Sequence, residues 1–297
     1  MNKIDVNSKL KHRFSRRDFL KFSASSALGI LVAAAGVDYM IKNKFDAWEV
    51  VQIQLVLPGL PASFSGMRLV QISDIHLGGW MNIQRLKSVL DIVQKIAPNV
   101  IAITGDFVIW SRWAETKDSE LDEMESELGS LARQIPILAV LGNHDHWADA
   151  SVVTKMLTRA GVRTLNNDVE SFQINGEFLY FGGVDDVLVE SNRLDQVLAK
   201  LPEKSCAILL AHEPDFAVES AETGRFELQI SGHSHGGQVN LPGVGPPVLP
   251  QWGKKFPSGL YKVGNMVQYT NRGVGMTRPY IRVNCPPEIT VFTLFSP

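Results

Sequence analysis

The chain has 297 residues, of which 45% are hydrophobic and 20% charged, with 29 Lys and Arg against 31 Asp and Glu. This composition excludes a disordered chain, a basic nucleic-acid binder and a protein that crosses the membrane many times, and it predicts a globular core. The charge is uneven, because residues 1–35 carry seven Lys and Arg but two Asp and Glu, so the remainder is acidic. Two cysteines, Cys206 and Cys285, are too few for a disulfide scaffold and suit either one bridge or two buried thiols.

The basic N-terminal segment has the layout of an export signal. A positively charged stretch is followed by an uncharged run of 16 residues, Phe22 to Val37. As a helix this run would span about 24 Å, which is shorter than a hydrocarbon core of about 30 Å. Within the charged stretch, residues 15–21 (SRRDFLK) resemble the twin-arginine signal S-R-R-x-F-L-K.

This resemblance implies that the protein is exported already folded, through the twin-arginine translocation machinery. The destination would be the periplasm or the outer face of the cytoplasmic membrane. Residues 33–35 (AAA) are a candidate cleavage site, and a segment retained as a membrane anchor is equally consistent with the sequence. The predicted organisation is therefore a signal peptide or anchor over 1–37 and one domain over 48–297.

Beyond this segment, the apolar pattern alternates between strands and helices. It predicts strands over the ranges 48–57, 67–72, 100–103, 137–141, 207–211 and 228–230. It predicts helices from Ile83 to a stop at Pro98, over 118–134 and over 151–160, with β-rich sequence over 162–182. Such alternation is typical of an α/β fold. The last quarter, 241–297, is rich in Gly and Pro and is expected to form an antiparallel addition on the same core.

Polar side chains recur where the predicted strands end. Asp, Asn or His follows five of these strands, and in open α/β sheets ligands bind beyond the carboxyl ends of the strands. Six of the seven histidines lie in these clusters, and only His12 lies elsewhere. The clusters are Asp74-Ile75-His76, Gly105-Asp106, Gly142-Asn143-His144-Asp145-His146, His212 and Gly232-His233-Ser234-His235. We therefore expect the five strand ends to converge on one site.

The spacing within these clusters favours metal binding over isolated polar residues. Asp74 and His76 are two residues apart, as are His233 and His235, so each pair can face one side of an extended segment. Mixed imidazole and carboxylate donors suit Zn, Mn or Fe. Because no cluster contains cysteine, a structural thiolate zinc site is not expected.

The order D-x-H, G-D, G-N-H-D, H and G-H-x-H resembles the calcineurin-like metallophosphoesterase superfamily over roughly residues 67–240. The tail, with Gly236-Gly237-Gln238, residues 272–275 (RGVG) and residues 284–288 (NCPPE), resembles its bacterial cell-envelope branch. That branch includes twin-arginine-exported phosphodiesterases and hydrolases of a UDP-diacylglucosamine precursor of lipid A. The resemblance implies a layered α/β sandwich, with two mixed β-sheets flanked by helices.

The resemblance also assigns the clusters to two divalent metal ions. One ion would be held by Asp74, His76, Asp106 and His235, and the other by Asp106, Asn143, His212 and His233. Two divalent charges need an anionic ligand between them, and Asp106 stands at a Gly-flanked strand end where it can offer one oxygen to each. Bridged cations lie about 3.5–4 Å apart, and the implied reaction is in-line attack on phosphorus by a metal-bridging hydroxide.

Neighbours of the ligands are expected to act on the substrate. Because Asn143 fills the ligand position, His144 is expected to contact the phosphate and to protonate or stabilise the leaving oxygen. Asp145 would either accept the other ring N–H of His144 or cap the following helix, and the sequence leaves both interpretations open. His146 is expected to be solvated or to lie at the substrate rim. Arg272 is a candidate for binding a second phosphate, with a solvated arginine as the competing interpretation.

The sequence leaves two activities open, and both would use the same metal ligands. One is a general phosphodiesterase, and the other is a UDP-2,3-diacylglucosamine pyrophosphatase that acts at the membrane. The loop over 241–261 places apolar side chains beside two lysines, which suits an acylated phosphate or a membrane interface. Trp80, Trp110, Trp113 and Trp147 follow ligand motifs and would either line a groove or pack the loops. We expect a small-molecule or lipid-linked phosphate as partner and no nucleic acid, because the acidic body would repel its backbone.

A non-catalytic metal-binding envelope protein that kept the fold is the alternative from another class. Such a protein should have a broken ligand set, whereas this sequence retains every motif residue, including His144. The sequence therefore favours an enzyme, a metallophosphoesterase of the phosphodiesterase type.

Overall fold

A computed structural model describes residues 47–111 and 114–297, which belong to a compact unit from Phe45 to Pro297. The predicted twin-arginine signal and the uncharged run after it lie outside the described residues, as does Trp113. Among the helices that the structure describes, none is both long and apolar enough to cross a membrane.

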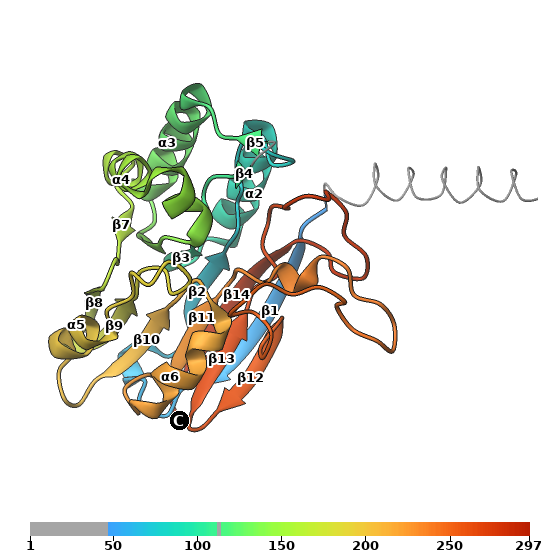
Figure 1. The fold of residues 1–297 in the computed structure, drawn as a ribbon. Coiled ribbons are helices and arrows are strands. Elements are labelled where there is room, and N and C mark those ends of the chain that lie inside the picture. The colour runs from blue at the N-terminus through green and yellow to red at the C-terminus, as the bar shows by residue number, and fades with distance from the viewer. Residues whose placement is uncertain (1–46, 112–113) are drawn as a thin grey trace, which may run out of the picture. The chain divides into compact units, whose positions relative to one another are not determined.

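The first of two six-stranded sheets carries most of the N-terminal half of this unit (Figure 1). Its strands, in spatial order, are β1 (Glu49–Val56), β14 (Glu288–Phe295), β2 (Met67–Ile72), β3 (Val100–Thr104), β6 (Ile137–Val140) and β7 (Arg163–Thr164). Its outer face is covered by the helices α2 (Ile83–Ile96), α3 (Asp118–Ala132) and α4 (Asn143–Arg159). β2, β3 and β6 run parallel, so their carboxyl ends lie at one edge.

Helix α2 follows the sequence pattern closely. Asn82 caps it by accepting a hydrogen bond from the backbone N–H of Arg85, and Ala97 ends it in the left-handed conformation directly before Pro98. Its apolar stripe at helical spacing is buried against the sheet. The predicted stop and the buried face are both confirmed.

The second sheet holds the remaining long strands. In spatial order they are β12 (Gly259–Val263), β13 (Met266–Thr270), β11 (Leu228–Ser231), β10 (Cys206–Leu210), β9 (Glu177–Gly183) and β8 (Asp168–Ile174). The short helices α5 (Leu194–Lys200) and α6 (Ala217–Glu222) pack on its outer face. A two-stranded hairpin, β4 (Trp110–Ser111) and β5 (Ala114–Glu115), stands apart from both sheets.

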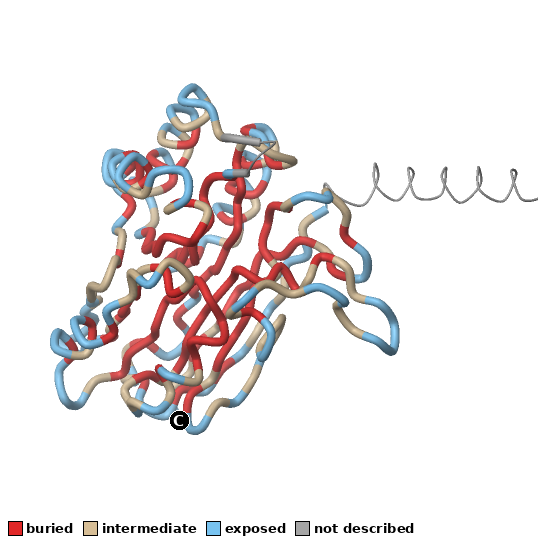
Figure 2. Tube along the Cα trace, viewed as in Figure 1, coloured by how far each residue is buried: buried red, intermediate tan, exposed pale blue. Residues whose placement is uncertain are grey.

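The two sheets pack face to face, and their facing side chains form one apolar core. β3 and β10 are buried at every position, as expected for strands that are covered on both faces. Figure 2 shows burial concentrated along the strands, with exposed residues on the outer sides of the helices. The fold is thus the expected α/β sandwich of two mixed sheets flanked by helices.

The expectation of an antiparallel addition on the same core at the C-terminus is confirmed only in part. β12 and β13 do form an antiparallel hairpin, but β13 pairs parallel with β11 inside the second sheet. β14 pairs with β1 on one side and β2 on the other, in the middle of the first sheet. Its largely buried apolar sequence explains why it lies inside a sheet.

Helix α4 begins eight residues before the predicted start, at Asn143 within a ligand motif. The predicted segment is recognisable, because Asp149 has extended backbone (φ −174°) that interrupts the helix. The side chain of Asp149 accepts from the N–H groups of Ser151 and Val152, at 2.9 and 3.1 Å, as a helix cap does. The preceding turn places the ligand motif at a helix N-terminus.

Candidate metal centre

Five strand ends deliver polar side chains to one edge of the sandwich, so the predicted convergence is confirmed. β2 is followed by Asp74 and His76, β3 by Asp106, β6 by Asn143 and His144, β10 by His212, and β11 by His233 and His235. Apart from the half-buried His144, these side chains are at most 7% exposed. The sequence therefore brings two carboxylates, an amide and five imidazoles into one buried cluster.

The backbone of the cluster has a conformation that side chains rarely adopt. Positive φ values between 50° and 68° occur at Asp74, His76, Asp106, His233 and His235. Such a residue costs on the order of 1–3 kcal/mol and persists at functional sites where the surrounding structure holds it. Packing leaves little freedom here, because a Cβ on Gly142 would collide with Oδ1 of Asp106.

Donor atoms from different strands come close enough to share a cation. Nε2 of His235 lies 3.0 Å from Nε2 of His76 and 3.3 Å from Oδ1 of Asp74. Oδ2 of Asp106 lies 3.5 Å from Nε2 of His76 and 3.3 Å from Nε2 of His212. Three groups of three donors result, and they overlap at Asp74, His76 and Asp106. The third group, Asp74, Asp106 and His212, shares a carboxylate with each of the other two, whereas those two share only His76.

Two imidazoles have their orientation set by a backbone carbonyl. Nδ1 of His212 donates to the carbonyl of Thr104 at 2.7 Å, and Nε2 of His233 donates to the carbonyl of Gln251 at 2.8 Å. In the neutral rings the other nitrogen then carries a lone pair, so His212 presents Nε2 and His233 presents Nδ1.

Two buried polar atoms beside Asp106, both able to bind a metal ion through a lone pair, have no hydrogen-bond partner. They are Oδ1 of Asn143 and Nε2 of His212. A buried polar atom left unpaired costs roughly 1–3 kcal/mol, and both atoms are of the kind that divalent cations bind. The residues present therefore fit a metal ion.

Burial and charge together perturb the titration of the cluster in the absence of a cation. Burial raises the pKa of Asp74 to about 7 and lowers the pKa of His76 to about 3. Although burial opposes the shift, Asp106 raises the pKa of His212 well above its usual range. The cluster thus retains protons that a cation would displace, and metal binding should release them.

Asp145 supports the cluster from behind instead of touching the ring of His144. One carboxylate oxygen accepts from the backbone N–H groups of Phe107 and Val108, at 2.8 and 3.2 Å. The other accepts from the N–H groups of Asp106 and Gly142, both at 2.9 Å. Of the two predicted roles, the cap of the following helix is present and the contact with His144 is not, because all four donors are backbone groups.

His144 is held at the cavity by contacts on three sides. Its backbone N–H donates to Oδ1 of Asp106 at 2.9 Å, and its Nδ1 accepts from the backbone N–H of Trp110 at 3.3 Å. Its ring packs against Trp147, with centroids 4.9 Å apart. Because Nδ1 accepts, the neutral ring carries its proton on Nε2. His144 can therefore donate a hydrogen bond through Nε2.

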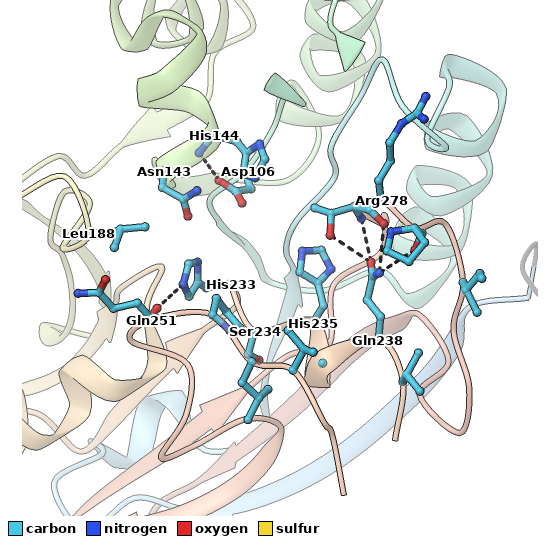
Figure 3. Close-up of a pocket in the computed structure, with 18 of the residues that line it drawn as sticks. Asp106, Asn143, His144, Leu188, His233, Ser234, His235, Gln238, Gln251 and Arg278 are labelled. Atoms are coloured by element: carbon cyan, nitrogen blue, oxygen red, sulfur yellow. Dashed lines mark hydrogen bonds between the residues drawn. The ribbon is translucent and has the colours of Figure 1, made fainter. Parts of the chain in front are cut away.

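A cavity of about 630 Å³ opens onto the cluster (Figure 3). The metal-binding wall comprises Asp106, Asn143, His144, His233 and His235. The loop wall is apolar and comprises Val239, Pro247 to Pro250, Pro279 and Ile281. In Figure 3, Leu188 and Gln251 lie on one side of His233, and Gln238 and Arg278 lie on the other. The cavity thus extends to both sides of the cluster.

The model of the calcineurin-like phosphoesterase family matches residues 67–237, which contain every donor of the cluster. The chain belongs to this family. It is similar to YkuE of Bacillus subtilis (strain 168), an uncharacterised metallophosphoesterase, with 33% identity over 292 residues, 96% of this chain and 99% of that protein. The phosphodiesterase YaeI of Escherichia coli (strain K12) is 26% identical over 284 residues, 94% of this chain and 99% of its own length. This calcineurin-like phosphoesterase is therefore a hydrolase of phosphoric esters.

Among solved structures, a putative 5′-nucleotidase from Staphylococcus aureus is similar with a TM-score of 0.45. The sequence identity is 12%, and the likeness covers 76% of this chain and 54% of that chain. At this distance neither substrate nor mechanism transfers.

In this phosphoesterase Arg272 is not placed to bind a phosphate. Its guanidinium donates to the carboxylates of Glu288 and Glu49, the latter at 2.9 Å, and the side chain does not line the cavity. Arg278 lines the cavity instead, although its side chain extends away from His144 and Asp106 (Figure 3). The structure supports neither the phosphate-binding nor the solvated interpretation of Arg272, because its guanidinium is paired with two carboxylates.

The sequence analysis missed two polar residues that fix the loop over 272–284. The buried Gln238 donates to the carbonyls of Thr277 and Pro279, at 3.1 and 3.2 Å. The buried Arg282 donates to the carbonyls of Arg272 and Gly275, both at 2.7 Å. Gln238 belongs to a tail motif that the sequence had singled out, but no pattern indicated that Arg282 would be buried.

His146 lies beside the cluster and forms an ion pair. Its Nε2 lies 2.8 Å from Oδ1 of Asp185, and this hydrogen bond raises the pKa of His146. The neighbouring Asp186 accepts from the backbone N–H of Val189 at 2.8 Å and so stabilises the turn that follows it. The expectation of a solvated or substrate-rim role for His146 did not anticipate this pair.

The predicted tryptophans divide between the two roles. Trp147 lines the cavity, and Trp110 stacks near it, with ring centroids 6.3 Å apart. Trp80 packs away from the cavity, 6.4 Å from the ring of Trp48 and with Arg85 over its face. Of the four predicted tryptophans, Trp113 lies outside the described residues, and among the other three only Trp147 lines the cavity.

Proposed function

We propose that this calcineurin-like phosphoesterase is a phosphodiesterase that uses two divalent metal ions. The observation that carries the proposal is the overlap of donor groups at Asp106 beside a cavity that extends to both sides of the cluster. One ion would be held by Asp74, His76, Asp106 and His235, and the other by Asp106, Asn143, His212 and His233. The donor types suit Mn, Zn or Fe.

When bound, two such cations would lower the pKa of a shared water and offset charge on the phosphoryl oxygens. The chain itself fixes the geometry, because Oδ1 of Asp106 accepts from the backbone N–H of His144 while Oδ2 faces His76 and His212. His144 holds a proton on Nε2 and lines the same cavity. It is therefore placed to donate a hydrogen bond from Nε2 to the leaving oxygen and to stabilise the charge that develops there.

A diester fits the cavity better than a monoester does. A diester carries a substituent on each side of its phosphorus, and the lining continues past His233 toward Leu188 and, on the other side, toward Gln238. The similarity to a protein named as a phosphodiesterase also supports this choice.

A second candidate substrate is a lipid-linked pyrophosphate, as in a UDP-2,3-diacylglucosamine pyrophosphatase. The loop wall favours it, because its valine, leucine, isoleucine and proline side chains would contact an acyl chain rather than a sugar or a nucleotide. Both candidates require the same ligands and differ only in what the loop wall contacts.

A substrate panel with metal-reconstituted enzyme tests both candidates. It compares bis-aryl phosphodiesters, phosphomonoesters, cyclic nucleotides and UDP-2,3-diacylglucosamine under one metal at a time. We expect kcat/KM for a diester or for the lipid-linked pyrophosphate to exceed that for the monoester of the same leaving group. A preference for monoesters would contradict the proposal.

We also infer that the protein acts beyond the cytoplasm, since residues 15–21 resemble a twin-arginine signal. Replacing Arg16 and Arg17 by Lys keeps the charge but removes the planar guanidinium fork. The double variant should accumulate inside the cell as folded, active enzyme, whereas the parent should fractionate with the envelope. Equal export of the two proteins would show that residues 1–37 act as a generic anchor or another type of signal.

A further inference from the structure

Next to the loop wall, a turn over residues 241–245 stands clear of the rest of the molecule. Leu241 and Gly245 exchange two backbone hydrogen bonds, of 3.0 and 2.9 Å, that close the turn. Val244 at its tip is 77% exposed and Leu241 is 40% exposed. No heavy atom lies within 4 Å of the position that a Cβ would take on Gly243 or Gly245. An ordered turn thus presents apolar side chains to solvent.

The surroundings of this turn are uncharged over a long stretch of chain. No Asp, Glu, Lys or Arg occurs in the 18 residues from Gly236 to Gly253. The turn is anchored to the neighbouring loop, because Asn240 N–H donates to the carbonyl of Val283 at 2.9 Å. That loop adds the 38% exposed Val283 and an arginine, Arg278, which lies over the ring of Tyr280 at 5.3 Å. We call Leu241, Val244, Arg278, Tyr280 and Val283 the docking edge.

The N-terminal segment joins the folded unit close to the docking edge. β1 is parallel to β14, and β14 is antiparallel to β2, so β1 begins at the edge where β2 delivers Asp74 (Figure 1). The indole N–H of Trp48 donates to the carbonyl of Val274, at 2.9 Å, in the same loop that carries Arg278. The uncharged run ends at Val37, and nine residues separate it from Ala47. The ten residue-to-residue steps from Val37 to Ala47 therefore span at most about 35 Å.

We propose that the docking edge inserts into the surface of a phospholipid bilayer and turns the mouth of the cavity toward it. Exposed valine and leucine at a turn, beside an arginine and a tyrosine that suit the headgroup region, are the chemistry of an interfacial contact. The short connection to a basic, then uncharged, segment places the same edge within reach of the membrane. A phosphoester carried by a lipid would then meet the metal-binding wall without leaving the bilayer.

The proposal goes beyond the proposed function and is measured without turnover, so it can fail while the hydrolase assignment stands. Both native cysteines are buried and unsuited to labelling, and burial raises the pKa of the Cys206 thiol to about 12. A fluorophore on Val244→Cys in the full chain therefore reports on the docking edge alone. The vesicles consist of phosphatidylcholine and phosphatidylglycerol, with a nitroxide quencher on the lipid acyl chains.

The matched control is Ile174→Cys, at the opposite edge of the sandwich. β9 runs parallel to β10, whose carboxyl end delivers His212, so the turn before β9 lies at the far edge. Ile174, the last residue of β8 before that turn, is 41% exposed, and Gly176 in the turn is as open as Gly243. Ile174, Leu241 and Val244 do not line the cavity, so the labelled chains should hydrolyse a soluble diester as the parent does.

We expect the lipid nitroxide to quench the label at position 244 and not the label at position 174. In a chain labelled through Val283→Cys, Leu241→Ser with Val244→Ser should weaken docking roughly tenfold per side chain. Equal quenching of the two positions, or none at 244, would overturn the proposal. A change in emission at 244 that follows protein concentration without lipid would also overturn it, because the edge would then bind a second copy of the chain.

Discussion

The metal-binding wall and the loop wall of the cavity are built in opposite ways. In the metal-binding wall, ligands sit directly at strand ends and five of them have strained backbone, and hydrogen bonds to Asp145 hold the segment that carries Asp106. In the loop wall, proline, valine and leucine come from Gly- and Pro-rich loops held by a few contacts to Gln238 and Arg282. We therefore expect the metal-binding wall to carry out the reaction and the loop wall to determine which substrates bind.

The largest effect should follow from Asp106→Asn, which changes the shared carboxylate of the metal-binding wall. The amide cannot supply two anionic oxygens, so both cations should be lost or weakly held. Turnover should fall further than the roughly 10²–10⁴-fold expected from loss of one positioned acid. Metal analysis and steady-state rates check this, and two tightly held ions with parental rates would refute the shared ligand.

His144→Ala should separate binding from chemistry within the same wall. We expect metal content to be retained and the rate to fall about 10²–10⁴-fold, with a smaller loss for substrates that have a good leaving group. His144 also falls within one of the donor groups, so metal content is the deciding readout. A variant that loses metal would make His144 a ligand instead of a proton donor.

Asp145→Asn tests whether metal affinity at the metal-binding wall depends on the carboxylate of Asp145. The amide would turn an N–H₂ group toward two backbone N–H donors, which leaves them unpaired. We expect metal affinity to fall about 10–100-fold, as for other groups behind metal ligands. Ala at the exposed Asp149 is the comparison, since that cap lies away from the cluster. Equal metal affinity in the two variants would show that the support is dispensable.

Leu249→Ser tests the loop wall. It should raise KM about tenfold for a diester with a large apolar substituent, because one apolar contact in a pocket contributes roughly that factor. The kcat for a small diester and the metal content should not change. Val244→Ser, outside the cavity, is the control. If Leu249→Ser lowers kcat for every substrate, the two walls are not separable.

The smallest effect concerns the ion pair between His146 and Asp185, beside both walls. Because the pair raises the folded pKa of His146, its stabilisation is present below the unfolded value of 6.5 and is lost as pH rises through the folded pKa. At most about 1 kcal/mol of unfolding free energy should be involved. Asp185→Asn should reduce the stability difference between about pH 6 and about pH 8, measured by denaturant unfolding. An unchanged difference would mean that the pair contributes nothing.

The sequence predicted the metal-binding wall far better than the loop wall, for a physical reason. A buried strand that stops at a polar residue fixes both the position and the direction of that residue, so Asp74, Asp106 and His212 could be assigned to one edge. Asp145 could not, because its partners at 106–108 lie far away in the sequence and are backbone groups. Composition indicates neither which strand β14 pairs with nor which arginine, Arg272 or Arg278, meets a carboxylate.

The shared role of Asp106 is tested most directly by anomalous diffraction from crystals of the protein loaded with Mn²⁺. The account predicts two peaks about 3.5–4 Å apart, with Asp106 bound to both. One peak, or two peaks that do not share Asp106, would contradict it.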